Sequence, residues 1–452
     1  MRLLILLYFV TTGGGTRAQQ MSTGSVAQTA TCAVAAVTGN VTLNCPGLDP
    51  AVVRILNEQF KARLKDRDLR VEQLTREAND WKDKFVALTT RLADAGVNDG
   101  QRRKAEDLLK AGKFEEAGRV LDEVLAGGEK EIDEVAKSQF ERATLYELQF
   151  QPLQALPHYE KAYNYRSKNP NYGRAYADLL YRQRDFVKAE SVYQEVLQAY
   201  RELAKANPQA YLQDVAGTLN NLGILYRATQ RLEESRDAYT EALQAYRELA
   251  KANPQAYLPY VAGTLNNLGN LYYVTQRLKE SGGAYTEALQ IQRKLAKANP
   301  QAYLPHVATT LNNLGILYRD TQRLKESGDA YTEALQIQRK LAKANPQAYL
   351  PEVATTLNNL GVLYLRTQRL KESGGAYTEA LQIRQELAKA NPQAYLPDVA
   401  TTLSNLGNLY KAERRDKEAA DVCDEARAIY KQLAADSPAK FGQRPDFACT
   451  VR

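Results

Sequence analysis

Amide side chains are the most regularly spaced chemical groups in this 452-residue sequence. An Asn-Asn pair lies within the stretch Thr-Leu-Asn-Asn-Leu-Gly-x-Leu-Tyr, as at residues 310–318, and the stretch returns 46 residues away in either direction. A primary amide carries two hydrogen-bond donors and an acceptor, so a ladder of amides can bind a polypeptide backbone irrespective of its sequence. The same amides can instead bridge neighbouring helices. The pattern alone leaves both roles open.

Groups that could support catalysis or nucleic-acid binding are scarce. The chain has two histidines, no phosphate-binding loop of the Gly-x-x-x-x-Gly-Lys type, no serine nucleophile elbow and no cysteine paired with a histidine. His306 occupies a position that varies between copies, as a tolerant surface position does, and His158 has no matched set of ligands. The net charge of +7 is spread thinly and forms no basic stripe. We therefore predict no enzyme activity, no cofactor, no metal ion and no nucleic-acid partner.

The four cysteines fit an oxidising compartment. If residues 37–40 form a hairpin turn, strict strand pairing places Cys32 directly opposite Cys45 in a non-hydrogen-bonded pair, whose close Cα atoms suit a disulfide. Closing this loop would stabilise the fold by about 3 kcal/mol in the chain-entropy model. Cys423 is expected on the buried side of a helix, where a free thiol is common. Its pairing with Cys449 is an open alternative.

The N-terminus is typical of an exported protein. Arg2 precedes an apolar run at residues 3–10, and a small-x-small site ends at Ala18, so residues 1–18 are predicted to be a signal peptide. Eight apolar residues are too few to cross a bilayer, and no later segment has the roughly 20 that a transmembrane helix requires. A start at Met21 is the alternative. We expect an exported chain, periplasmic or extracellular, with no transmembrane segment.

After a small segment at residues 19–48 that holds the Cys32/Cys45 hairpin, residues 49–95 show a seven-residue apolar period. Asn57 and Arg67 interrupt it. The apolar positions are Val53, Phe60, Leu64, Val71, Leu74, Ala78, Trp81, Phe85, Leu88 and Leu92. This pattern predicts one long helix between Pro50 and Gly96. The helix either forms a coiled coil that makes a homo-oligomer through residues 53–92, or folds back on its own repeat domain.

Downstream the sequence repeats itself with a period of 46 residues. The motif Asn-Pro-Gln-Ala-Tyr marks each copy, with its prolines at Pro208, Pro254, Pro300, Pro346 and Pro392. Such self-similarity means stacked supersecondary units. Each copy has two amphipathic stretches, and Asn-Pro ends the second because the residue before proline leaves the α region. We expect the next residues to form a loop, with a recurrent tyrosine such as Tyr303 packed between units. The pairs Gly282-Gly283 and Gly374-Gly375 predict a close approach of the two helices of a hairpin.

These residues resemble the tetratricopeptide repeat. In one copy the resemblance rests on Leu314, Gly315, Tyr318, Ser327, Tyr331 and Ala334. The phrase Val-Ala-Thr-Thr-Leu-Asn-Asn-Leu-Gly is most similar to the kinesin light chain subgroup. Two departures are the longer segment between copies and a serine where the family favours alanine, so no motor association is carried over. Three divergent copies resemble the same repeat in residues 99–206. The five extended copies cover 207–436, and 437–452 is a tail.

The resemblance implies an all-α fold, a right-handed superhelix of helical hairpins whose first helices line a concave groove. It places the groove positions on the first Asn of each pair, namely Asn220, Asn266, Asn312 and Asn358, with Ser404 in the last copy. The second Asn, such as Asn221, fits a bridging role better. The nearby positions that vary would set specificity. Counted one turn beyond the residue after each glycine, these are Arg227, Tyr273, Arg319, Leu365 and Lys411.

The predicted function is therefore a non-enzymatic scaffold that binds extended segments of other proteins in the concave groove. Basic and aromatic side chains along the groove suit a partner with acidic and apolar residues. The alternative is a structural or oligomerising rod, or a spacer in the cell envelope, whose length is set by the number of copies.

Overall fold

Helices make up almost all of the described chain. The computed structural model describes residues 32–37, 40–66, 71–94, 100–126 and 132–436. The predicted signal peptide and C-terminal tail lie outside these residues. Two strands, β1 (Ala33–Val37) and β2 (Asn40–Asn44), precede the helices α1 (Pro50–Asp66) and α2 (Val71–Asp94). The later helices pair as α3 (Gly100–Lys110) with α4 (Phe114–Ala126), α5 (Ile132–Leu148) with α6 (Pro152–Tyr165), α7 (Pro170–Arg182) with α8 (Phe186–Ala206), α9 (Pro208–Ala228) with α10 (Leu232–Ala252), α11 (Pro254–Val274) with α12 (Leu278–Ala298), α13 (Pro300–Asp320) with α14 (Leu324–Ala344), α15 (Pro346–Arg366) with α16 (Leu370–Ala390), and α17 (Pro392–Ala412) with α18 (Asp416–Asp436).

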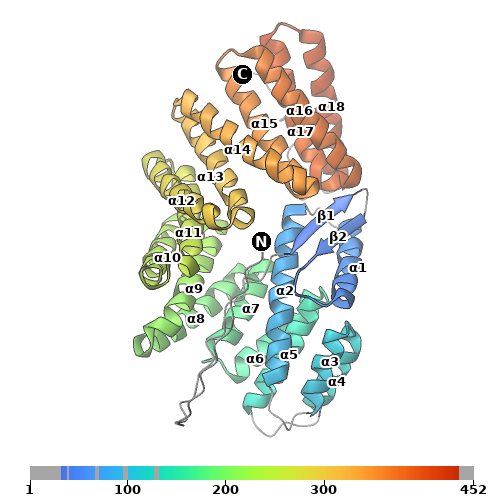
Figure 1. Ribbon diagram of the computed structural model, residues 1–452, viewed down its shortest axis with the longest axis vertical. Coiled ribbons are helices and arrows are strands. Elements are labelled where there is room, and N and C mark those ends of the chain that lie inside the picture. The colour runs from blue at the N-terminus through green and yellow to red at the C-terminus, as the bar shows by residue number, and fades with distance from the viewer. Residues whose placement is uncertain (1–31, 38–39, 67–70, 95–99, 127–131, 437–452) are drawn as a thin grey trace, which may run out of the picture.

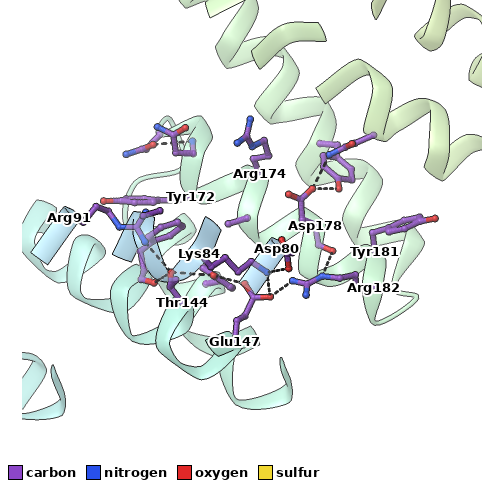
Figure 2. Close-up of a pocket in the computed structure, with 18 of the residues that line it drawn as sticks. Asp80, Lys84, Arg91, Thr144, Glu147, Tyr172, Arg174, Asp178, Tyr181 and Arg182 are labelled. Carbon is purple, nitrogen blue, oxygen red and sulfur yellow. Dashed lines mark hydrogen bonds and ion pairs between the residues drawn. The ribbon is translucent and has the colours of Figure 1, made fainter. Parts of the chain in front are cut away.

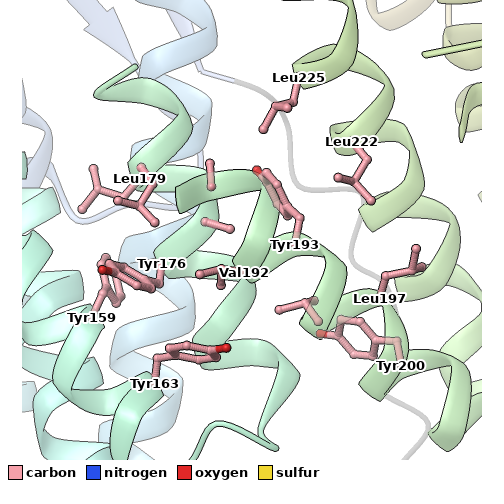
Figure 3. Packing of buried hydrophobic residues seen from close by; sticks show 14 of the residues in the cluster. Tyr159, Tyr163, Tyr176, Leu179, Val192, Tyr193, Leu197, Tyr200, Leu222 and Leu225 are labelled. Carbon is pink, nitrogen blue, oxygen red and sulfur yellow. The ribbon is translucent and has the colours of Figure 1, made fainter. Parts of the chain in front are cut away.

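The helical hairpins follow one another in a curved array (Figure 1). Buried side chains lie between successive hairpins, and no single globular centre is needed. Figure 3 shows one such cluster, in which Tyr176 of α7 and Val192 and Tyr193 of α8 are followed by Leu222 of α9. The predicted all-α stack of hairpins is confirmed.

A single asparagine connects one 46-residue copy to the next. Asn299 ends α12 and also caps α13, where its side chain accepts a hydrogen bond from the Ala302 backbone N–H at 3.2 Å. Pro300 then takes the first helical position, which needs no amide donor. The prediction of a loop between copies was therefore wrong, because Pro-Gln-Ala-Tyr is the first turn of a 21-residue helix. Two helices of this length and two short connections account for the 46-residue period.

The two helices of the first four long copies are joined by Thr-Gln-Arg, whose glutamine adopts a left-handed conformation, and in the fifth copy Arg414 takes the place of the glutamine. Gln322 has a φ of 63°. The turn closes when the Arg323 N–H donates to the Tyr318 carbonyl at 2.8 Å. The Arg323 guanidinium then lies over the Tyr318 ring, 4.1 Å from its centroid. The same arginine-tyrosine pair recurs in the other four long copies.

Close packing of the two helices explains the Leu-Gly motif and the serine that departs from the family. A Cβ atom on Gly315 would lie 2.5 Å from Cε1 of Tyr331. Only glycine leaves room for this ring. The Ser327 hydroxyl donates to the Gly315 carbonyl at 2.7 Å, so the serine joins the helices at the same point. Ser235, Ser281 and Ser373 make the equivalent bond in their own copies.

The paired glycines have a different environment from the one predicted. A Cβ on Gly283 or Gly375 would meet nothing within 4 Å. Gly282 and Gly374 face a leucine of the next copy, 3.3 and 3.4 Å from the built Cβ. Close approach within one hairpin is therefore not the reason for these glycine pairs, and for Gly283 and Gly375 no packing reason is found.

The N-terminal strands form an antiparallel hairpin closed by the Cys32–Cys45 disulfide. The hairpin is held by α1 and α2. Asn57 of α1 accepts from the Leu43 N–H at 2.5 Å, and Asn79 of α2 accepts from the Cys32 N–H at 2.6 Å. Asn57, which interrupts the apolar period, thus binds backbone within the same chain.

The single long helix predicted for residues 53–92 is wrong, because the structure has two helices, α1 and α2, with residues 67–70 outside the described part. Of the predicted positions whose side chains are described, all but the half-buried Val53 are buried. They pack against the chain itself, as where Trp81 and Phe85 meet Phe114 of α4. The alternative of a helix that folds back on its repeat domain is therefore the correct one. The described part of this apolar seam is buried against the same chain.

The N-terminal unit also reaches a repeat far along the chain. Helix α15 touches β1 and α2 (Figure 1). Ala348 and Tyr349, from the first turn of α15, belong to the same apolar cluster as Cys32 and Leu43. Ala348 is only 8% exposed, whereas the equivalent Ala210 and Ala256 are exposed; Ala394 of the last copy is buried too, but in a cluster with α18 rather than with the N-terminal unit. We call this packing of β1 and α2 on α15 the closing contact, because it joins the start of the array to its fourth long copy.

Cys423 is not the free core thiol that was expected. It is buried, at 4% exposed, and disulfide-bonded. Cys449 lies outside the described residues. None of the helices in the described part of the chain is both long enough and apolar enough to cross a membrane.

Candidate functional site

The asparagine pairs lie on the first helices of the long copies and form a ladder from one helix to the next. The second Asn of a copy donates to the first Asn of the preceding copy. Asn267 Nδ2 lies 3.2 Å from Asn220 Oδ1, and Asn405 Nδ2 lies 2.9 Å from Asn358 Oδ1. The steps between them run from Asn313 to Asn266 and from Asn359 to Asn312. Both residues of each pair therefore bridge helices, which was expected only of the second.

Each bridge uses only one hydrogen-bonding atom of each amide side chain. The Nδ2 of the first Asn and the Oδ1 of the second make no hydrogen bond to any described residue, as at Asn266 and Asn313. Both side chains are half-buried, and Asn358, at 9% exposed, is the most enclosed of the first set. Each bridge thus presents one donor and one acceptor, which is the pair that an extended backbone requires. Ser404 bonds to its own helix instead, donating to the Ala400 carbonyl at 2.9 Å.

The side chains at the variable positions differ in their solvent exposure and in their contacts with other side chains. Arg227 and Lys411 are exposed, and Leu365 is half-buried. Tyr273 and Arg319 are held by a residue that sequence reasoning missed, Asp320 at the end of α13. The Tyr273 hydroxyl donates to Asp320 Oδ2 at 2.5 Å, and Arg319 Nε lies 2.9 Å from Asp320 Oδ1. Although partial burial raises the pKa of Asp320, its bonds to Arg319 and Tyr273 lower it below the ordinary value overall.

Next to the ladder lies a cavity of 740 Å³ between α2 and the first helices of three hairpins (Figure 2). Asn221 and Ile224 of α9 are its only lining residues from the long copies. α2 contributes Lys84 and Arg91, and α7 contributes Asp178 among others. The cavity was not predicted, because its walls come from segments more than 100 residues apart.

Most charges in the cavity neutralise one another. Glu147 of α5, which is 8% exposed, pairs with Lys84 at 2.9 Å and with Arg182. It also accepts from the Tyr159 hydroxyl at 2.7 Å. Burial alone raises the pKa of Glu147, but Lys84 and Arg182 hold the pKa below its ordinary value. Asp80 completes the cluster at 3.0 Å from Lys84.

No group of three or more His, Cys, Asp or Glu residues in the described part of the chain is placed to hold a metal ion. His306 is exposed on α13 and lies 6.4 Å from the Tyr303 ring, measured between centroids. His158 lies in α6, where its Nδ1 is 2.7 Å from Gln139 Oε1. Burial and the nearby Arg142 lower the pKa of His158. Both histidines have structural neighbours within the protein.

Comparison with known proteins agrees with the geometry. A tetratricopeptide repeat model matches residues 260–340, 306–386 and 352–432, and a second tetratricopeptide repeat model matches 215–255. Among curated proteins no sequence match was found. Among solved structures, BtubC (BKLC) from P. vanneervenii is similar over 56% of this chain and 92% of its own, with 25% identity and a TM-score of 0.45.

Two further solved structures are similar at lower identity. RapI in its apo form is 12% identical and covers 66% of this chain and 99% of its own, with a TM-score of 0.46. A putative kinesin light chain from Podosopora anserina with nearly identical repeats is 16% identical over 49% of this chain and 96% of its own, with a TM-score of 0.39. Repeats of this family support protein interaction. The chain is therefore a protein-interaction scaffold that carries tetratricopeptide repeats, with matched copies between residues 215 and 432.

Proposed function

We propose that the chain binds extended segments of other proteins along the concave face formed by α9, α11, α13, α15 and α17, without catalysing a reaction. The observation that carries this proposal is the asparagine ladder. Each bridge leaves one amide donor and one amide acceptor without a partner among the described residues, at the same place in successive copies. A repeated donor and acceptor would bind the backbone of a segment whatever its side chains.

Selection among segments would come from the positions that differ between copies. Arg227 and Lys411 present exposed cations on α9 and α17, and Leu365 offers a half-buried apolar side chain on α15. Arg319 is partly neutralised by Asp320. A segment with acidic residues towards its ends and apolar residues between them suits this order.

The test separates the bridging role of the amides from their binding role. Replacing Asn266, Asn312 and Asn358 by Asp keeps the Oδ1 acceptors of the bridges but removes the free donors and adds charge. Replacing all three by Ala removes both roles. Capture of partners, measured by cross-linking in the native envelope and identification of what is attached, should be lost in both variants while helicity by circular dichroism is retained.

A matched control removes three polar groups from the second helices of the same copies. Thr286, Thr332 and Thr378 are exposed, and their replacement by Ala should leave capture unchanged. Capture that survives in the Asp variant and fails only in the Ala variant would assign the amides to structure. Capture unchanged in both would favour a spacer without a binding groove.

We also propose that the protein acts outside the cytoplasm, in the periplasm or extracellular space. A signal-like sequence at residues 1–18 and the disulfide bonds at Cys32, Cys45 and Cys423 support this proposal, since disulfides persist in oxidising compartments. Deleting residues 2–18 should retain the protein in the cytoplasm with reduced thiols. A deleted form found in the exported fraction would argue against this location signal.

A further inference from the structure

Two charged side chains on opposite walls of the 740 Å³ cavity make no ion pair with any described residue. On one wall, Arg91 of α2 makes no ion pair with any described residue, although the charge of Glu141 acts on it from farther away. Its Nε is excluded from solvent and has no acceptor, and its Nη2 makes one long bond, 3.4 Å to the Thr144 hydroxyl. The guanidinium rests over the Phe140 ring, 4.8 Å from the centroid. A donor that is shielded from solvent and has no acceptor is costly, so the half-buried Arg91 would be stabilised by a ligand that supplies an acceptor to its Nε.

On the other wall, Asp178 of α7 makes no ion pair with any described residue, although the charges of Arg174, Arg182 and Lys84 act on its carboxyl from farther away (Figure 2). Its Oδ1 accepts hydrogen bonds from the Tyr193 hydroxyl and from Asn221 Nδ2, the latter at 3.1 Å. Neither partner carries a charge. Burial raises the pKa of Asp178 and lowers the pKa of Arg91, so the protein interior opposes both charges.

The remaining charges of the cavity already have partners. Lys84, Arg182, Glu147 and Asp80 form one paired cluster, and Arg174 pairs with Asp214 at 3.0 Å. Among the charged side chains that line the cavity, Arg91 and Asp178 are therefore the two that make no ion pair with a described residue, and they come from different walls.

We propose that this cavity binds a small zwitterion, a molecule with an anionic group at one end and an ammonium group at the other. The anionic end pairs with Arg91 and the ammonium end with Asp178. The volume lies in the range of about 300–1,000 Å³ that is typical of small-molecule sites. Tyr172, next to Arg91, and Tyr181, beyond Asp178, also line the cavity and offer aromatic surface with a polar edge (Figure 2). The site does not depend on segment binding in the groove, because only Asn221 and Ile224 of its lining come from the long copies.

Oligoglycines of two to five residues are suitable probes, because they are zwitterions whose end-to-end length increases in steps. Isothermal titration calorimetry should show binding that peaks at one length. The N-acetylated or C-amidated form of that peptide should bind about tenfold more weakly, since a charge-assisted hydrogen bond is lost. A chain that binds none of the free oligoglycines at millimolar concentration overturns the proposal, and so does equal binding of free and capped forms.

Four variants test the two walls. Arg91→Gln and Asp178→Asn should each weaken binding about tenfold, and Asp178→Asn keeps the Oδ1 that accepts both existing bonds. Arg103→Gln and Asp107→Asn make the same changes at exposed positions of α3 and should bind as the parent does. Equal losses in all four variants would contradict the proposal. The Asn266, Asn312 and Asn358 to Ala variant should retain oligoglycine binding, so failure of the groove and failure of the cavity are distinguishable.

Discussion

At the scale of single residues, the repeated motif is explained by one contact between two helices. Gly315 has no side chain and so leaves space for the Tyr331 ring, and the Ser327 hydroxyl donates a hydrogen bond to the Gly315 carbonyl. The sequence shows that these residues recur at the same positions of successive copies, but it does not show which contact each residue makes. A tyrosine in one helix requires a glycine sixteen residues earlier in the other, so the pair behaves as one unit of packing.

This pairing predicts opposite effects for two Gly→Ala changes in neighbouring copies. Gly315→Ala forces a methyl group against the Tyr331 ring and should lower the free energy of unfolding by about 1–3 kcal/mol. Gly283→Ala meets open space in a helix interior and should raise it by about 0.5–1 kcal/mol. Urea unfolding followed by circular dichroism measures both. Equal destabilisation by the two changes would show that the ring contact is not the cause.

The second prediction at this scale concerns pH. Burial raises the pKa of Asp178 above its unfolded value of about 3.9. The stability linked to this group is fully present below the unfolded pKa and is lost as pH rises through the folded pKa. Asp178→Asn should therefore be more stable than the parent at pH 7, with the difference shrinking as pH falls toward 4. Urea midpoints at several pH values give the comparison, and a difference that stays constant with pH would contradict this linkage.

The variable positions show where sequence reasoning stops. The residues equivalent to His306 were taken as tolerant surface, but three of them contact the preceding hairpin, among them Asp214, which pairs with Arg174. Tyr260 stacks on Tyr246 at 5.1 Å between centroids, and Arg384 donates to the Asp398 carbonyl at 3.0 Å. An alignment of the copies compares residues at equivalent positions of the repeat. These contacts join residues at different positions of two successive copies, so the alignment does not reveal them. Asp320 escaped notice for the same reason.

At the scale of elements, periodicity predicted what is buried but not what buries it. The apolar steps from Ala78 to Leu92 correctly mark the inner face of α2. The same steps fit a partner helix from another chain or the repeats of this one, because a seven-residue period specifies only a stripe. Likewise, Asn-Pro marked the boundary between copies, yet the cap and the proline begin a helix immediately.

The hairpin is the element whose removal should be easiest to measure. Replacing Cys32 and Cys45 by Ala removes a short closed loop and should cost about 3 kcal/mol of local stability. Trp81, the only tryptophan of the chain, lies in the adjoining cluster and donates to the Leu148 carbonyl at 2.7 Å. Its fluorescence should therefore change at lower urea concentration in the variant. Coincidence of the variant and parent fluorescence curves would count against a stabilising role.

At the scale of the whole molecule, the number of copies and their helical nature could be predicted, but not the closing contact. Tyr349 and Ala348 stand in a motif that is identical in five copies, so nothing in their own sequence distinguishes the copy that meets the N-terminal unit. The three-dimensional path of the chain brings α15 against β1 and α2.

The closing contact predicts a copy-specific change of shape. Ala348→Arg places a charged side chain in the buried cluster and should separate α15 from the N-terminal unit, which would raise the radius of gyration measured by small-angle X-ray scattering. Ala256→Arg alters the same motif position where it is exposed and should leave the radius unchanged. The same radius in both variants would mean that the contact does not hold the shape.

The closing contact also changes how stability is shared along the chain. In an open array each unit feels only its neighbours, so fraying at one end leaves the other end intact. Here Ala348 and Tyr349 pack against the disulfide-linked hairpin. The N-terminal unit and α15 therefore stabilise each other, although they lie far apart in the sequence. Loosening the first fifty residues should therefore speed amide hydrogen exchange in α15, some 300 positions away, before it does so in the intervening α11.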